Sequence, residues 1–340
     1  MDSLTQIVLG AACGEIALGE KIGNKALLFG AIGGTIPDLD VFLGNIFYSN
    51  AIDSMAFHRG FMHSIVFAFI ASYFLGLFIH KLYNTGKRID NLTTRKDWTL
   101  LFFLAIFTHP ILDSFTPYGT QLFLPFSNYR ISFNNISVVD PLYTLPFLFC
   151  LIITLFYKRT NSKRVTWTKA GIYISSAYML CTLGNKIYID TVFKKSFEKA
   201  NISYLRFRTQ PTILNNVLWY GIAETKTDYK VGYYSLFDKI ATVNTFISIP
   251  KNDSIVNVNE PDLKTLTWFS DAYYLIEKKE NPARIIYNDL RYVMSTNDSI
   301  KAMMTFELKK EGLRWTTKPS NNFNPPENFL TDFWTRLKGI

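Results

Sequence analysis

Apolar residues form long stretches in the first half of the chain, whereas polar and apolar residues mix in the second half. A helix of about twenty apolar residues is long enough to cross the hydrocarbon core of a membrane. The clearest such stretch is residues 61–79, interrupted mainly by His63 and Ser64. Further candidates are residues 98–116, 141–157 and 167–189, with shorter glycine-rich segments at residues 4–18 and 26–36. The pattern predicts an α-helical multi-pass membrane domain of about six apolar helices over residues 1–190.

From about residue 191 the pattern changes to the alternation that is typical of β-strands. Strands are predicted at residues 218–236, 273–277, 283–292 and 303–308, before a loop at residues 320–327 and a short amphipathic helix at residues 329–337. We therefore expect residues 191–340 to form a small α+β extramembrane domain that could cover a site at the membrane surface.

The formal net charge of +9 raises the question of nucleic-acid binding. Many of the basic residues, however, follow directly after apolar stretches, as in loops that set membrane topology and contact anionic lipid. The sequence has no compact basic motif with interleaved stacking aromatics. Membrane lipids are therefore the expected partners, and nucleic acid is not expected.

The basic residues are unevenly divided among the predicted loops. Residues 81–97 and 158–169 each hold five lysines and arginines, whereas residues 37–60 and 118–140 hold only Arg59 and Arg130. Loops rich in Lys and Arg stay in the cytoplasm. With six passes, both termini, the two poorly basic loops and the C-terminal domain would then lie on the non-cytoplasmic side of the membrane.

Three of the four histidines lie close to carboxylates at the ends of apolar stretches. An ionisable group at membrane depth is costly, so it usually has a partner and a function. Aspartate oxygens and imidazole nitrogens are typical ligands of hydrolytic divalent metal ions. Six residues are more than one tetrahedral ion can bind, so either two ions bind or some of the residues hydrogen-bond to the ligands instead of to the metal. Zinc is the favoured ion. The candidate metal ligands are Asp38, Asp40, His58, His63, His109 and Asp113.

Each candidate also has an ordinary structural explanation. His109 and Asp113 are four residues apart and would share one helix face, as two ligands or as a polar pair at a helix end. Asp38 and Asp40 follow Pro37, where aspartates also form turns and caps. His58 and His63 are five apart and do not share one clean helix face, so either could be a hydrogen-bonded core histidine.

Further roles follow from the same segments. Arg59, between two candidate ligands, could hold an anionic group such as phosphate, or could be an arginine whose charge reaches the membrane interface. A carboxylate that does not bind metal, Asp40 or Asp113, would accept a proton during catalysis. Asp2 and Gln6 are four apart and could add oxygen ligands, although Asp2 also fits a helix cap.

These segments resemble the membrane-bound metal-dependent hydrolases, the LexA-binding, inner-membrane-associated hydrolase family. The resemblance implies a multi-pass bacterial inner-membrane protein with a divalent-metal hydrolase site. It also implies a distant kinship to zinc-dependent phospholipase C-like enzymes, and hence phosphoester substrates. Many members have a histidine where this chain has Gln6, a weaker ligand. The matching stretches are residues 1–6 (MDSLTQ), 36–40 (IPDLD), 58–64 (HRGFMHS), 109–113 (HPILD) and 116–119 (TPYG).

The sequence thus predicts a membrane-embedded metal-dependent hydrolase, with catalytic roles for Asp40, Asp113 and Arg59. A metal-activated water would attack a phosphoester, or another ester or amide, of a lipid or envelope substrate at the non-cytoplasmic face. The alternative is a non-catalytic metal-binding scaffold or a transporter. A transporter should place its ionisable groups near the membrane midplane between two related halves.

Overall fold

The computed structural model describes residues 1–85, 93–252, 260–278, 284–296, 299–311, 314–319 and 329–340. The described chain divides into two compact units. A helical unit comprises residues 1–40, 59–185 and 213–216, and a second unit comprises residues 41–58, 186–212 and 217–340. Lys87, Arg88 and the loop expected at residues 320–327 lie outside the described residues.

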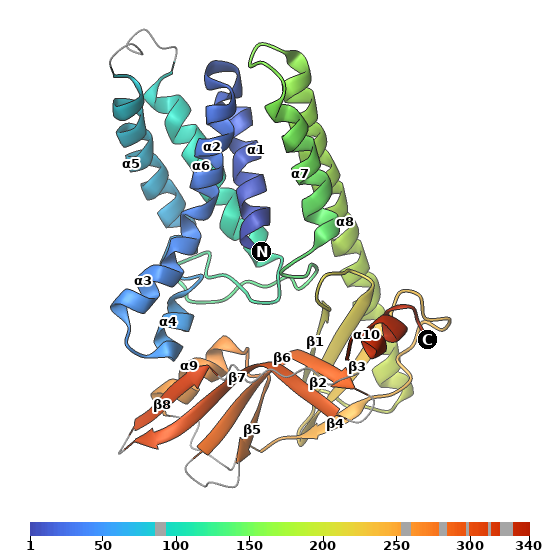
Figure 1. Ribbon diagram of the computed structural model, residues 1–340. Helices are drawn as coiled ribbons and strands as arrows, with labels where there is room; N and C mark the ends of the chain where they lie inside the picture. Colours follow the sequence, from blue (N-terminus) through green and yellow to red (C-terminus); the bar gives the residue numbers. More distant parts are fainter. Residues whose placement is uncertain (86–92, 253–259, 279–283, 297–298, 312–313, 320–328) are drawn as a thin grey trace. The chain divides into compact units, whose positions relative to one another are not determined.

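The helical unit is built from long helices joined by two short 3₁₀ turns (Figure 1). The last helix, α8, starts in this unit and continues into the second unit at residue 186. The elements are α1 (Ser3–Ile22), α2 (Asn24–Thr35), η1 (Pro37–Leu39), η2 (Phe61–His63), α5 (Ile65–Tyr83), α6 (Arg95–Ser114), α7 (Pro141–Leu155) and α8 (Ser162–Lys199).

Helices α1 and α2 approach closely along a seam of glycines. Gly10 and Gly14 on α1 face Gly30 and Gly34 on α2. A Cβ atom added to Gly34 would lie only 2.6 Å from the backbone oxygen of Gln6. Small residues allow such close helix packing inside a membrane bundle. The seam fixes α2, and the turn that follows it, against the start of α1.

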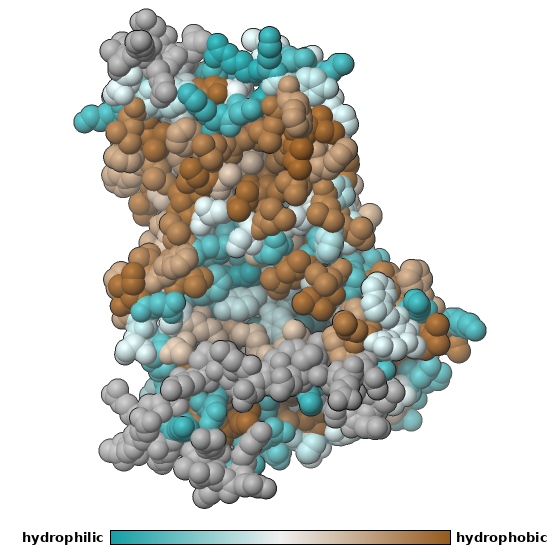
Figure 2. Space-filling model, in the orientation of Figure 1, coloured by the Kyte–Doolittle hydropathy of each residue, from teal (hydrophilic) through white to brown (hydrophobic). Residues whose placement is uncertain are grey.

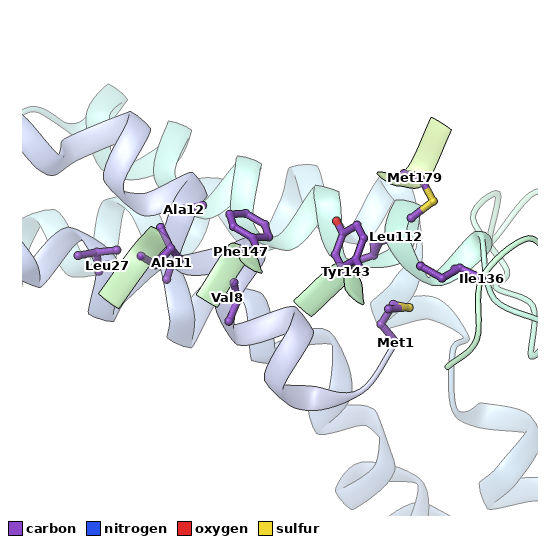
Figure 3. Close-up of a cluster of buried hydrophobic side chains, with 11 residues drawn as sticks. Met1, Val8, Ala11, Ala12, Leu27, Leu112, Ile136, Tyr143, Phe147 and Met179 are labelled. Atoms are coloured by element: carbon purple, nitrogen blue, oxygen red, sulfur yellow. The ribbon is translucent and has the colours of Figure 1, made fainter. Parts of the chain in front are cut away.

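Apolar side chains from α1, α2, α6, α7 and α8 fill the interior of the helical unit (Figure 3). Phe147 and Ala12 are fully buried there, and Tyr143 is 5% exposed. A second buried cluster surrounds Trp98, between α6 and the neighbouring helices α1, α2 and α5. The two clusters hold the helix ends that carry the candidate ligands.

The prediction of about six apolar membrane helices was wrong. The described residues contain ten α-helices and two antiparallel sheets. Among the helices that the structure describes, only α5 is long and apolar enough to cross a membrane by itself. A second span is counted if α2 and the segment Pro37–Phe47, bent by 43° relative to each other, form one broken span.

Charge, polarity and length explain the difference. α7 is apolar but has only 15 residues. α1 contains Glu15, Glu20 and Lys21, and α6 begins with Arg95, Lys96 and Asp97. Such residues lower mean hydropathy, and a charged side chain at the centre of a bilayer is costly.

The helical unit nevertheless exposes many apolar side chains, which Figure 2 shows as brown atoms over its helices. On α5, Phe69, Phe74 and Phe78 are each about 60% exposed. Monomeric soluble proteins rarely expose contiguous apolar surface on this scale, so the surface is suited to lipid contact.

The second unit contains two four-stranded antiparallel sheets, ordered β1-β2-β3-β4 and β5-β6-β7-β8. Its strands are β1 (Arg206–Pro211), β2 (Leu218–Glu224), β3 (Asp228–Ser235), β4 (Ile247–Pro250), β5 (Tyr274–Lys278), β6 (Arg284–Thr296), β7 (Ser299–Glu311) and β8 (Arg314–Pro319). Its helices are α3 (Asp40–Phe47), which starts at the border between the units, α4 (Ala51–Phe57), α9 (Pro261–Phe269) and α10 (Phe329–Leu337).

Helices cover both sheets of the second unit. The end of α8 packs Phe193 and Phe197 against Trp219 of the first sheet. α4 and α9 pack together against the second sheet. The Tyr220 hydroxyl donates a 2.7 Å hydrogen bond to the Leu290 carbonyl, which links the two sheets at an irregularity in β6.

Candidate metal centre

Three segments of the helical unit meet at one end of its helices. Asp38 lies in η1, where Pro37 interrupts the helical path after α2. His63 ends η2, and the next residue, Ser64, caps α5 by accepting a hydrogen bond from Phe67 N. His109 and Asp113 are one turn apart near the end of α6. Helix ends therefore place these four side chains together.

The four side chains form a compact group whose ligand atoms all lie within 4.8 Å of one another. Nε2 of His63 is 3.1 Å from Nε2 of His109. Oδ1 of Asp38 lies 3.5 and 3.4 Å from these nitrogens, and Oδ2 of Asp113 lies 3.4 and 3.6 Å from them. Tetrahedral ligands at zinc–ligand distances of about 2.0–2.1 Å are about 3.3–3.4 Å apart, so the spacing fits a zinc-sized ion.

The outer nitrogen of each imidazole has a partner that orients the ring. His109 Nδ1 lies 2.6 Å from the Gly34 carbonyl oxygen. His63 Nδ1 lies 2.9 Å from Oδ2 of Asp40. If each Nδ1 carries the proton, each Nε2 has a lone pair directed into the group. Carbonyl and carboxylate partners of this kind are typical behind metal-binding histidines.

Asp113 is held by several groups besides the two histidines. Its Oδ1 atom accepts hydrogen bonds from the Met1 amino group and, at 2.9 Å, from Gln6 Nε2. Its Oδ2 atom lies 3.0 Å from Nε of Arg59. These contacts keep one carboxylate oxygen aimed at the imidazoles.

The group lies in a strongly negative electrostatic field and is mostly shielded from water. The side chains of His63, His109 and Asp113 are at most 1% exposed, whereas that of Asp38 is 27% exposed. Burial alone lowers the pKa of His63, but the carboxylates of Asp113, Asp38 and Asp40 raise it to about 10. The same field attracts a cation, and Asp38 gives the group its contact with solvent.

The remaining predicted residues are not among these four donors. Asp40 supports His63 and accepts a 2.9 Å hydrogen bond from the Arg59 backbone. His58 follows α4 in the second unit. It is not one of the four described residues that together could hold a metal ion. Asp2 caps α1, and Gln6 contacts Asp113.

Sequence reasoning missed a second set of residues beside the group. The Thr116 hydroxyl accepts a 2.9 Å hydrogen bond from Arg59 Nη1. The guanidinium carbons of Arg59 and Arg130 lie over the ring of Tyr118, at 4.6 and 5.0 Å from its centre. Thr116 and Tyr118 fall in the matching stretch TPYG, which was the available signal.

Backbone hydrogen bonds tie the loop between α6 and α7 to the same end of the unit. Gln121 N donates to the Arg59 carbonyl at 3.1 Å, and Ile65 N donates to the Leu122 carbonyl at 3.0 Å. Asp2 N donates to the Val138 carbonyl at 2.9 Å. The loop is therefore part of the site's framework.

The helices expose apolar side chains and surround a buried His/Asp group that could hold a metal ion. These two features define the class: a membrane protein with a candidate metal centre. The chain belongs to the YdjM inner membrane protein family, whose model matches residues 1–190. It is thus a member of an inner-membrane family, and the match covers all four residues of the group.

Two relatives extend this result. The chain is 25% identical over 307 residues to the uncharacterized protein YfhP of Bacillus subtilis, covering 86% of this chain and 87% of the relative. It is 36% identical over 110 residues to the inner membrane protein YbcI of Escherichia coli, covering 32% of this chain and 57% of the relative. No solved structure matches the chain significantly.

Proposed function

We propose that this protein is a metal-dependent hydrolase of the inner membrane, with zinc as the favoured ion. The spacing of the two Nε2 atoms and two carboxylate oxygens carries the proposal, since five of the six distances between them are 3.1–3.6 Å, which matches the edges of a zinc-centred tetrahedron. The partners of the two Nδ1 atoms support it, because they orient each ring with its Nε2 towards the other donors. Four such donors favour one ion over two.

The unequal exposure of the donors supports catalysis over a purely structural role. Structural zinc sites are closed, whereas catalytic sites keep one position for water. The buried residues His63, His109 and Asp113 would hold the ion, and Asp38, which reaches solvent, would leave the fourth position to water. A bound zinc ion would lower the pKa of a water molecule and polarise a phosphoryl oxygen.

The surroundings of the three aspartates favour Asp38 as the proton acceptor. Asp40 is occupied by His63 and the Arg59 backbone, and Asp113 is held by Gln6 and Arg59. In the proposed reaction, water adds to phosphorus and the ester P–O bond breaks. Asp38 takes the water proton and passes it to the departing alkoxide.

A lipid or envelope phosphoester is the proposed substrate, because the family is an inner-membrane one and Arg59 lies beside the group. We also propose that the site faces the non-cytoplasmic side. Its residues lie at one end of the helices, whereas Lys21, Lys81, Arg95 and Arg159 lie at or near the opposite helix ends. The positive-inside rule puts the basic end in the cytoplasm.

Hydrolysis by purified protein tests this proposal. Zinc-loaded protein in detergent should hydrolyse p-nitrophenyl phosphate or bis-p-nitrophenyl phosphate, and chelation should abolish the activity. His109→Ala should be inactive, whereas His80→Ala, at the other end of α5, should match the wild type. If the protein binds stoichiometric zinc but hydrolyses no phosphate ester, carboxylate ester or amide, the metal-binding scaffold or transporter is favoured instead.

A further inference from the structure

Arg59, Arg130 and Tyr118 form a stack, called here the arginine–tyrosine stack, beside the His/Asp group. The guanidinium carbon of Arg59 lies 4.6 Å from the centre of the Tyr118 ring, and that of Arg130 lies 5.0 Å from it. Guanidinium groups bind favourably over aromatic faces. Two cations near one ring repel each other, so an anion bound nearby would relieve this repulsion.

Arg59 connects this stack to the candidate metal ligands. Its Nε atom is 3.0 Å from Oδ2 of Asp113, the oxygen that faces both imidazoles. Its Nη1 atom donates to Thr116, and its side chain is 5% exposed. With Nε and Nη1 engaged, Nη2 is the nitrogen best placed to contact a ligand that reaches the group.

The backbone fixes Arg130 on the other side of the loop. Its Nη2 atom donates a 3.0 Å hydrogen bond to the Gly119 carbonyl. The adjacent residue Ile131 pairs with Thr120 through two backbone hydrogen bonds of 3.0 and 2.9 Å. Gly119 has a positive φ of 83°, and a Cβ there would lie 3.1 Å from Cβ of Arg130. The turn therefore brings the Arg130 stem close to the TPYG segment and limits its freedom.

Charge decides what the stack can bind. Asp38, Asp40 and Asp113 supply three negative charges, and Arg59 and Arg130 supply two positive charges. A bound divalent ion would leave the assembly with one net positive charge. Such an assembly attracts an anion, and a dianion more strongly than a monoanion.

We propose that Arg59 and Arg130, positioned over the Tyr118 ring, bind the terminal phosphate of a phosphomonoester, with one phosphate oxygen directed at the His/Asp group. This inference rests on the proposed function and specifies its substrate class. Planar guanidinium groups match phosphate oxygens through paired donors, which a lysine does not reproduce. A phosphodiester carries one charge fewer and binds more weakly.

Phosphate binding tests the stack without requiring catalysis. Calorimetry on the full chain in detergent, loaded with zinc, would use inorganic phosphate, dihexanoyl phosphatidic acid and dimethyl phosphate as probes. Arg130→Gln should weaken phosphate binding about 10- to 100-fold, the range expected for a charge-assisted hydrogen bond. Its zinc content should stay at the wild-type value, because Arg130 is not among the four donors. Arg159→Gln is the matched control, since this exposed arginine contacts the Lys21 carbonyl instead.

Conservative variants keep the test valid if Arg130→Gln folds poorly. Arg130→Lys keeps the charge but loses the planar pair of N–H donors, so it should bind phosphate at least several-fold more weakly. Tyr118→Phe keeps the ring and should bind within about twofold of the wild type. Tighter binding of phosphatidic acid than of phosphate assigns a lipid source, and equal binding assigns a soluble organophosphate; both support the stack.

Other outcomes separate this inference from the hydrolase proposal. Wild-type phosphate affinity in Arg130→Gln and Arg130→Lys would overturn the stack and leave the metal centre untouched. Dimethyl phosphate binding as tightly as phosphate would overturn the monoester assignment. If wild-type protein holds no zinc but Arg130→Gln still loses phosphate, the anion site stands and the hydrolase proposal fails.

Discussion

The helical unit has a buried polar group at each end, and the two groups differ in how completely their charges are matched. Away from the candidate metal centre, Arg164 forms a two-fold ion pair with Glu15, with both N–O distances 2.6 Å. Arg164 Nη1 also donates to Asn24 at 2.6 Å and to the Tyr157 carbonyl at 2.9 Å. At the candidate centre, two imidazole nitrogens instead face each other among several carboxylates.

This difference distinguishes a structural group from a binding group. A buried ion pair with its hydrogen bonds satisfied needs nothing from outside, and it holds α1, the α1–α2 turn and α8 together. At the candidate centre, two imidazole nitrogens and two carboxylate oxygens within 4.8 Å of one another are arranged as the ligands of a cation. Burial and charge alone would not separate the two ends, whereas the convergence of four possible ligand atoms does.

The largest expected effect comes from breaking the satisfied end. Arg164→Met leaves the Glu15 carboxylate buried without its partner, which costs about 3–5 kcal/mol in the free energy of unfolding. Unfolding in detergent, followed by circular dichroism, measures this loss. Zinc content per folded molecule should not change, because the candidate centre lies at the opposite end.

The double variant Glu15→Met/Arg164→Met is the control for this prediction. It removes both charges and should recover most of the stability, since apolar replacement of a buried pair is often neutral. A double variant as unstable as Arg164→Met would show that the other hydrogen bonds of Arg164, rather than the charge pairing, hold this end.

The next largest effect is loss of metal from the candidate metal centre. His109→Ala removes one of the four donors and should weaken zinc binding by more than about 100-fold, a larger loss than removal of a supporting residue causes. Elemental analysis after dialysis against a weak chelator measures this. Stability without zinc should change far less than in Arg164→Met. Equal zinc in His109→Ala and wild type would show that the ion binds elsewhere.

Sequence patterns located this centre because its residues sit at helix ends. The spacing of four between His109 and Asp113 places both on one face of α6. The pattern did not show which member of each neighbouring pair joins the group. Asp38 and Asp40 are two apart across a 3₁₀ turn and contact opposite nitrogens of the His63 ring. Arg59 has a positive φ of 58° between His58 and His63, a turn that residue spacing does not reveal.

The sequence was less informative about the helices of the helical unit. Apolar stretches identified the surroundings of α1, α2, α6 and α7, but hydropathy could not tell a long span from a short or partly charged packed helix. The glycine seam and the pairing of Glu15 with Arg164 depend on contacts between distant segments. Arg130 went unassigned for the same reason, since a loop rather than a periodic element brings it to Tyr118.

A smaller effect should follow from removing support behind a ligand. Asp40→Asn keeps the size of the side chain but removes the charge 2.9 Å from His63 Nδ1. Zinc affinity should fall about 10- to 100-fold, as is typical for a lost supporting carboxylate. Competition with a fluorescent chelator measures the change. A loss as large as that of His109→Ala would instead make Asp40 a direct ligand.

The smallest predicted effect tests whether the glycine seam sets the geometry of the candidate centre. In Gly34→Ala, the new Cβ would lie 2.6 Å from Gln6 O, so α2 must shift at the residue whose carbonyl orients His109. We expect a stability loss of about 1–2 kcal/mol, within the range for overpacking, with a several-fold drop in zinc affinity.

Gly184→Ala is the matched control, because no atom lies within 4 Å of its added Cβ, and it should be neutral or slightly stabilising. Gly14→Ala, at the Ala26 contact further along the seam, should lower stability without changing zinc affinity. Equal zinc loss in Gly14→Ala and Gly34→Ala would mean that the two ends respond as one body, and that local pairing does not separate them.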